Sequence, residues 1–169
     1  STKVTVDTSG NVLIGDTASA TSDLLQIESP ASGGGGGIHI RRNDSNNDQQ
    51  VGIVRFGNNS NANLASIIGK TDGSVDNGKL IFKTRPSGAG IEERMVIDSA
   101  GNVGIGVTPK TDWHTGYDAI QIGESSAFFG KSAGDEVFMA QNARYTSSGW
   151  KYNSSGTATL FDMQSGNTR

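Results

Sequence analysis

The segment 111–118, TDWHTGYD, gathers residue types that could contact a ligand or act on one. Trp113 and Tyr117 are aromatic side chains of the kind that stack on the apolar faces of sugars, and His114, Asp112 and Asp118 can form hydrogen bonds to them. This segment is therefore the candidate site for a glycan or another receptor group. The alternative interpretation, to which we give more weight, is that Trp113 fills the end of a thin core between subunits.

Carboxylates could also do chemistry, because two of them about 5–9.5 Å apart can hydrolyse a glycosidic bond. The adjacent pairs at 92–93 and 135–136 do not suit this role, since neighbouring residues on a strand point to opposite faces. Asp112 and Asp118 are a more attractive pair, although both can equally be solvated loop charges. We therefore predict a protein that is not an enzyme, with no catalytic residue, no metal site and no cofactor. A polysaccharide-cleaving spike domain is the alternative.

The composition restricts the fold that could position these residues. Glycine, serine, threonine and asparagine make up 71 of the 169 residues, whereas hydrophobic residues reach only 33% and charged residues 18%. Stretches rich in Ala, Leu, Glu and Lys, which a helical bundle needs, are absent from the sequence. Apolar residues recur throughout, which excludes a highly charged disordered tail. These observations predict a β-rich chain with many turns and little material for a thick core.

Charge and residue usage also exclude several partners. The net charge is −3 with the two signs interspersed, which creates no field that would attract nucleic acid or an anionic membrane. The longest apolar runs are far shorter than the roughly 20 residues that cross a bilayer. The absence of cysteine excludes disulfides, thiol catalysis and cysteine-based zinc sites. We expect neither a nucleic-acid partner nor membrane insertion.

An internal repeat organises the chain. The sequences VDTSGNVLIG at 6–15 and IDSAGNVGIG at 97–106 share six of their ten residues. Further along, LLQIES at 24–29 corresponds to AIQIGE at 119–124, in the same order and at nearly the same offset. Two such matches indicate a real repeat.

Each copy of the repeat predicts a short β-hairpin with an Asp-x-x-Gly-Asn corner. Apolar and polar residues alternate on both sides of the corner, as expected for half-buried strands. Glycine and asparagine accept positive φ, and the aspartate can accept hydrogen bonds from the amides of its own turn. The same aspartate recurs with the same turn residues, which favours this structural role over a catalytic one. The predicted turn residues are Asp7, Gly10 and Asn11 in the first copy and Asp98, Gly101 and Asn102 in the second.

Short apolar segments separated by dense turn signals predict further strands and an all-β fold. Trp150 and Tyr152 lie at strand spacing, and we expect them to share a sheet face or a subunit contact. The predicted strands outside the hairpin blocks cover 38–41, 52–56, 64–69, 79–84, 128–129, 136–140, 149–152 and 157–162.

Such a chain has little means of burying apolar surface alone. Each predicted strand offers only two or three apolar side chains, worth roughly 25 cal/mol per Å² buried. Conformational entropy of about 1–2 kcal/mol per residue nearly cancels that gain. Open sheets also leave unpaired edges. We therefore expect identical chains to complete one another's sheets and to share a core.

The second repeat carries a resemblance to a known group of proteins. Segments 80–109 and 118–130 resemble the repeats of phage tail-fibre and related virion-fibre proteins, in which a strand and turn lead into Arg-Met-x-Ile-Asp-x-x-Gly-Asn-Val-Gly-Ile-Gly. The chain matches every specified position of that motif from Arg94 to Gly106. The first copy departs from it, with Lys3-Val4 in place of Arg-Met and Leu13 in place of a glycine. The stretch 142–168 is similar in style.

The resemblance implies an elongated, repeat-containing fibre segment of β-hairpins or β-sandwiches, assembled as an intertwined homotrimer. It implies a location on a virus particle, extracellular when acting, and does not indicate a particular receptor. We expect a structural component of a tail fibre that contacts other tail or baseplate proteins and takes part in host attachment through a surface glycan or protein. A capsid decoration or head fibre is a further alternative.

The repeat also divides the chain. We expect a first hairpin block at 1–29, a strand module at 30–93, a second hairpin block at 94–125 and a strand module at 126–169 that continues beyond the chain end. On this division the chain is a segment of a longer polypeptide.

Overall fold

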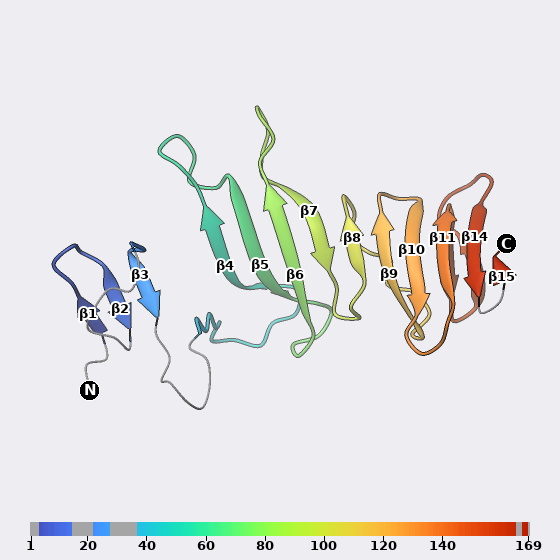
Figure 1. The fold of residues 1–169 in the computed structure, drawn as a ribbon, viewed down its shortest axis with the longest axis horizontal. Helices are drawn as coiled ribbons and strands as arrows, with labels where there is room; N and C mark the ends of the chain where they lie inside the picture. Colours follow the sequence, from blue (N-terminus) through green and yellow to red (C-terminus); the bar gives the residue numbers. More distant parts are fainter. Residues whose placement is uncertain (1–3, 15–21, 28–36, 165–166, 169) are drawn as a thin grey trace. The chain divides into compact units, whose positions relative to one another are not determined.

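The computed structural model describes residues 4–14, 22–27, 37–164 and 167–168, and all of its regular structure is β-strand (Figure 1). The predicted all-β class is confirmed. The chain divides into two compact units, Ser1–Ile40 and Arg41–Arg169, which are described separately. Among the described residues there is no helix long and apolar enough to cross a membrane.

The first unit contains a three-stranded sheet in the order β1-β2-β3. Its strands are β1 (Val4–Val6), β2 (Val12–Ile14) and β3 (Leu25–Ile27). β1 and β2 form an antiparallel hairpin, and β3 then pairs in parallel with β2. The parts of the predicted first hairpin block at 1–3, 15–21 and 28–29 lie outside the described residues.

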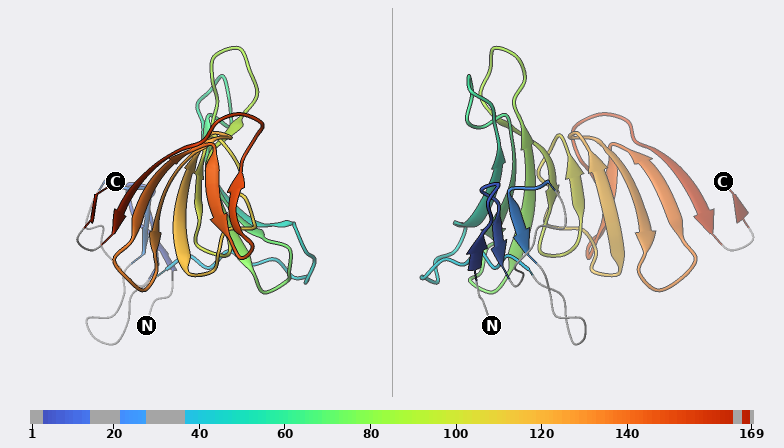
Figure 2. Two further views of the ribbon diagram at one scale, coloured as in Figure 1. Left: turned by 90° about the vertical axis from the view of Figure 1, so that its right-hand side faces the viewer. Right: turned by 60° about the vertical axis from the view of Figure 1, so that its left-hand side comes forward.

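The second unit contains a ten-stranded sheet, which Figure 2 shows to be twisted. From one edge to the other, its strands follow the order of the chain, and all neighbours are antiparallel except β8 and β9. The sheet is continuous, so the divisions expected after residues 93 and 125 both fall inside it. The strands are β4 (Gln50–Phe56), β5 (Ala65–Thr71), β6 (Gly78–Thr84), β7 (Glu92–Ile97), β8 (Val103–Ile105), β9 (Tyr117–Ile122), β10 (Ser126–Lys131), β11 (Val137–Gln141), β14 (Thr159–Gln164) and β15 (Asn167–Thr168).

Strands β7, β8 and β9 pair in the same way as β1, β2 and β3. An antiparallel hairpin is followed in each unit by a parallel strand, with Ile14 opposite Ile27 in the first unit and Ile105 opposite Ile122 in the second. In the second unit two buried side chains hold the crossover between β8 and β9. Asn102 Oδ1 accepts a hydrogen bond from the Ala119 amide at 3.1 Å, and Gln121 Oε1 accepts one from the Lys110 amide at 3.0 Å.

A small hairpin of β12 (Ala143–Thr146) and β13 (Gly149–Tyr152) leaves the sheet between β11 and β14. The chain turns out of the sheet at Asn142, which is buried and has a φ of 57°. Its side-chain Nδ2 donates to the carbonyls of Ser154 and Thr157, each at 3.1 Å, and its Oδ1 accepts the Ser154 amide at 2.8 Å. One asparagine therefore joins the start of the hairpin to the segment that returns the chain to β14.

Two clusters of buried residues lie on one face of the large sheet. Ile68, Ile81 and Val96 form the first, on β5, β6 and β7. The second lies on β9, β10 and β11 and includes Phe129 and Phe138, whose rings stack with centroids 5.0 Å apart. Strand alternation places these residues on the same side, because Ile68 is paired with Ile81, Ile81 with Val96 and Phe129 with Phe138.

Most predicted strands correspond to observed ones. The prediction of a strand at 38–41 is wrong, because this segment forms no regular structure and Ile38 and Ile40 are exposed. Alternating apolar residues predict a strand only where a neighbouring strand buries them, and this segment has none within the described residues. Strand β12 was not predicted, since its sequence ARYT has no apolar alternation.

Candidate functional site

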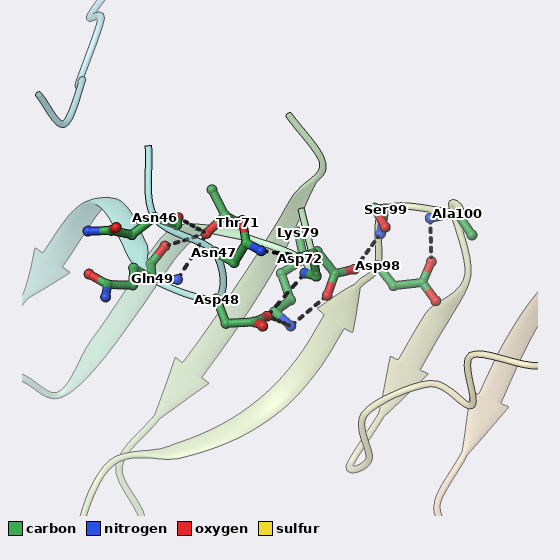
Figure 3. Close-up of polar contacts among 11 residues, drawn as sticks. Asn46, Asn47, Asp48, Gln49, Thr71, Asp72, Lys79, Asp98, Ser99 and Ala100 are labelled. Atoms are coloured by element: carbon green, nitrogen blue, oxygen red, sulfur yellow. Dashed lines mark hydrogen bonds and ion pairs between the residues drawn. The ribbon is translucent and has the colours of Figure 1, made fainter. Parts of the chain in front are cut away.

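The two Asp-x-x-Gly-Asn corners have the same hydrogen bonds. Oδ1 of Asp98 accepts the amide of Ala100 at 3.0 Å (Figure 3) and that of Asn102 at 2.8 Å. Oδ1 of Asp7 likewise accepts the amides of Ser9 and Asn11, each at 2.9 Å. These aspartates bind the backbone of their own turns, which is the structural role that the sequence favours.

Glycine is required at each corner by the backbone. Gly10 has a φ of 86° and Gly101 a φ of 89°, values that other residues adopt only with strain. The asparagine that follows each glycine is buried, and its side-chain Nδ2 donates to the second oxygen of the aspartate, at 3.0 Å in the first corner and 3.3 Å in the second.

The second corner is also joined to a neighbouring loop. Oδ2 of Asp72, between β5 and β6, accepts the Ser99 amide at 3.0 Å, and its Oδ1 lies 2.7 Å from Nζ of Lys79 (Figure 3). The hydrogen bond from Lys79 is the main cause that lowers the pKa of the Asp72 carboxyl below its usual value, with the Ser99 bonds adding to it. An ionised Asp72 therefore joins the two turns at this end of the sheet.

Trp113, the central residue of the predicted ligand site, lies in the second buried cluster. Only 7% of its surface is exposed, and its ring centroid is 5.1 Å from that of Phe129. It packs with alanines of β9, β10, β11 and β12. Its ring presents no free face on which a sugar could stack. The alternative interpretation, a core role, fits this position, although the core that Trp113 fills lies within one chain.

Tyr117 and His114 also belong to this aromatic cluster. The Tyr117 hydroxyl donates to Oε2 of Glu136 at 2.7 Å, and its ring meets that of Tyr145 edge to face at 5.4 Å. Burial, followed by the bond to Glu136, raises the pKa of Tyr117 to about 12. Nδ1 of His114 accepts the Gly116 amide at 3.0 Å, which shapes the turn before β9. Both polar groups are thus engaged within the chain.

The two carboxylates of the segment lie on opposite sides of the sheet. Asp112 forms a two-bond ion pair with Arg144 of β12, with Nε–Oδ1 at 2.8 Å and Nη2–Oδ2 at 2.9 Å. That hairpin covers the side of Phe129, since Trp150 of β13 lies 6.0 Å from Phe129 between ring centroids. Asp118 of β9 is exposed on the other side, where strand alternation places it one residue out of phase with buried Ala119. The structure therefore does not bring Asp112 and Asp118 together as an acid–base pair.

Sequence reasoning missed the residues that fix this region. Arg144 donates to the Tyr152 carbonyl at 3.0 Å and to Oδ1 of Asn153 at 2.8 Å, in addition to binding Asp112. Arg144 and Asp112 are 32 residues apart, and no local pattern signals that they meet. The only sequence feature that could have indicated this ion pair is an arginine within a stretch of small and aromatic residues.

Two aromatic side chains of β13 are more accessible than those of segment 111–118. Trp150 is 47% exposed and Tyr152 is 65% exposed. Together with Leu160 of β14 they line a shallow, mostly apolar pocket of about 270 Å³, which Lys151 borders. Exposed aromatic rings of this kind can stack on a sugar or on an apolar side chain.

Four of the six carboxylates considered for hydrolysis are bound by cations or by a hydroxyl. Glu93 lies 3.0 Å from Nζ of Lys83, and Glu92 lies 3.0 Å from Arg94. Hydrogen bonds from Tyr117 and then from Lys131 lower the pKa of Glu136, and the bond from Arg144 lowers that of Asp112. A general acid needs the opposite shift. Within the described ranges, no group of three or more His, Asp or Glu side chains is placed to hold a metal ion.

A further surface feature is the second side of the ten-stranded sheet, which we call the apolar face. Two rows of paired residues cross it, and many of their large side chains are about half exposed, such as Phe128 at 45% and Met139 at 56%. The first row runs through Val54, Ile67, Phe82, Met95, Ile105, Ile122, Ser126, Gln141 and Thr159. The second runs through Gly69, Leu80, Ile97, Val103, Ile120, Phe128, Met139 and Phe161. A shallow hollow of about 330 Å³ lies among Ile122, Phe128, Met139 and Phe161.

No protein-family model matches the chain, and no curated protein matches its sequence.

Proposed function

We propose that the chain is a structural, non-enzymatic segment of a virion fibre, namely a tail fibre in which three identical chains share a core. The observation that carries this proposal is the use of the motif residues. Asp98, Gly101 and Asn102, which carry the resemblance to fibre repeats, all serve the turn between β7 and β8, and the corresponding residues serve the turn between β1 and β2. A motif whose specific residues form turns has a structural role, as expected for the shaft or platform of a fibre.

The state of the carboxylates supports a role without catalysis. Asp112 and Glu136 are paired and have lowered pKa values, and Asp112 lies across the sheet from Asp118. A polysaccharide-cleaving spike needs a protonated acid facing a second carboxylate. Incubation with surface polysaccharide of the host should therefore release no reducing sugar; release would favour the spike domain instead.

Host attachment by such a fibre would use accessible side chains. Trp150 and Tyr152 offer exposed rings beside an apolar pocket, whereas Trp113 is buried. We therefore propose that the receptor binds at β13 and the adjoining part of β14, and not at segment 111–118, which was the candidate from the sequence.

The location on the particle can be tested by imaging. Antibodies raised against the chain and marked with gold should label fibres that project from the tail of the virus that encodes it, and should reduce adsorption of the particles to host cells. Labelling of the capsid would favour a head fibre or decoration protein. The absence of any label on intact particles would contradict a virion role.

A further inference from the structure

Several strands of the second unit are apolar on both sides. In β10, Phe129 is fully buried on one side, while the adjacent Phe128 is half exposed on the apolar face. In β9, buried Ala119 alternates with exposed Ile120 and Ile122. Strands with apolar residues in both phases are typical of sheets that are covered on both faces. Over β9, β10 and β11, the chain itself covers the other side with segment 111–116 and the β12–β13 hairpin.

We propose that the apolar face is the surface through which identical copies of this chain pack against one another. The inference rests on the homo-oligomer of the proposed function and assigns it a specific interface. Each copy supplies its two uncharged rows, and the copies together bury them.

The exposed area suits a stable contact between chains. Ten large apolar side chains of this face are each between 37% and 56% exposed: Val54, Phe56, Leu80, Ile105, Ile120, Ile122, Phe128, Met139, Phe161 and Met163. An aromatic side chain buries about 150–250 Å² in total, so the three phenylalanines together with the seven aliphatic side chains offer on the order of several hundred Å² per chain. One partner in a standard protein interface contributes about 800 Å². Burial of apolar surface contributes roughly 25 cal/mol per Å². Packing this area against a second copy would therefore stabilise the assembly substantially.

The distribution of charge favours a second copy over a partner of different chemistry. Neither row contains a charged residue. Asp118, Glu92 and Arg94 lie at the margins of the face. A highly charged partner would have no counter-charges here, and it would pay to desolvate its own groups. An identical face offers uncharged and mostly apolar side chains in return, and interfaces between identical chains are the more apolar class.

Single substitutions on the full chain test this assignment. Met139→Glu places a charge in the second row between Phe128 and Phe161, and Val75→Glu makes the same change on an exposed loop residue away from the face. Sedimentation should give a multiple of the 17.6 kDa chain mass for the parent and for Val75→Glu, and 17.6 kDa for Met139→Glu. A β-sheet circular dichroism spectrum checks that each variant is folded.

Cysteine cross-linking gives an independent readout if Met139→Glu does not fold. The chain has no cysteine, so Met139→Cys introduces a single thiol. A flexible bismaleimide should join chains of Met139→Cys covalently and leave Val75→Cys as single chains. A monomeric parent, an oligomer that survives Met139→Glu, or cross-linking no greater than that of Val75→Cys would each overturn the inference. These outcomes would leave the virion location intact, since gold labelling tests it separately.

Discussion

At the scale of single residues, the side chains that invite a chemical interpretation serve the backbone. The carboxylate of Asp98 accepts two turn amides, and that of Asp72 accepts a third across the gap to the next loop. Glycine at 101 supplies a φ that a β-branched residue resists. Such a corner could be predicted from sequence, because every group in it lies within five consecutive residues.

Substitution at this corner should destabilise the protein through strain alone. No heavy atom lies within 4 Å of a Cβ placed on Gly101, so Gly101→Val has space but must keep a φ of 89°. We expect a loss of about 1–2 kcal/mol in the free energy of unfolding, and impaired assembly. Gly78→Val, at an open position without positive φ, is the matched control and should be close to neutral. Equal melting of Gly101→Val and the parent would show that the turn is assigned incorrectly.

The ion pair of Asp72 predicts a dependence of stability on pH. Its folded-state pKa is lowered, so the unfolded chain binds a proton at higher pH than the folded chain does. The stabilisation is present above the unfolded pKa of about 3.9 and is lost as the pH falls through the lower, folded value. Urea unfolding from pH 7 to pH 3 should therefore show a shallower decline for Asp72→Asn than for the parent. Asp135→Asn, at an exposed turn position, should follow the parent; a parental decline in Asp72→Asn would contradict the assigned role.

At the scale of elements, the β12–β13 hairpin determines how the aromatic cluster is closed. Tyr145 and Trp150 face one another across the hairpin with ring centroids 5.2 Å apart, and Trp150 also lies 5.6 Å from Phe138 of the sheet. Arg144 anchors the hairpin to Asp112 in the segment before β9. The hairpin and segment 111–116 therefore stabilise one another over the same side of the sheet.

Loss of this anchor should cost more than loss of an exposed pair. The Arg144 side chain is 12% exposed and makes four hydrogen bonds to Asp112, Tyr152 and Asn153. We expect Arg144→Ala to lower the free energy of unfolding by about 2 kcal/mol, allowing for the partial exposure of Asp112. Arg144→Lys should recover only part of this loss, because an ammonium group cannot bind both carboxylate oxygens in the same way. Tryptophan fluorescence during urea unfolding measures the change.

The surface pair of Arg94 with Glu92 provides the comparison. Both side chains are close to half exposed, so Arg94→Ala should cost under about 1 kcal/mol. An equal or smaller loss for Arg144→Ala would mean that the hairpin is held by its aromatic rings and not by the ion pair.

Elements were predictable from sequence where neighbours in the chain pair with one another. The alternation in 52–56, 64–69 and 79–84 predicted β4, β5 and β6, which form consecutive hairpins. Contacts between residues far apart in the chain produce no comparable pattern in the sequence. Trp113 packs against Phe129 of β10, and its isolated position in a polar segment did not decide between a ligand contact and the core role that we favoured. The parallel pairing of β8 with β9 likewise depends on buried Asn102 and Gln121, whose partners lie 17 and 11 residues away.

At the scale of the whole molecule, the thin core expected from composition takes a definite form. The second unit builds one large sheet, covers one side at β9, β10 and β11 with its own aromatic cluster and leaves apolar rows exposed on the other side. A chain with 33% hydrophobic residues thus leaves part of its apolar surface exposed, and we propose that a second copy covers it. Association of identical chains would complete the second side of the sheet and give the fibre segment that we propose.

The mass of the full chain in solution tests this central claim most directly. Sedimentation equilibrium over a range of protein concentrations should give a single species at three times the 17.6 kDa chain mass, because three copies bury their apolar faces together. A stable, folded species of 17.6 kDa would contradict the account, since one chain would then tolerate the exposed rows without a partner.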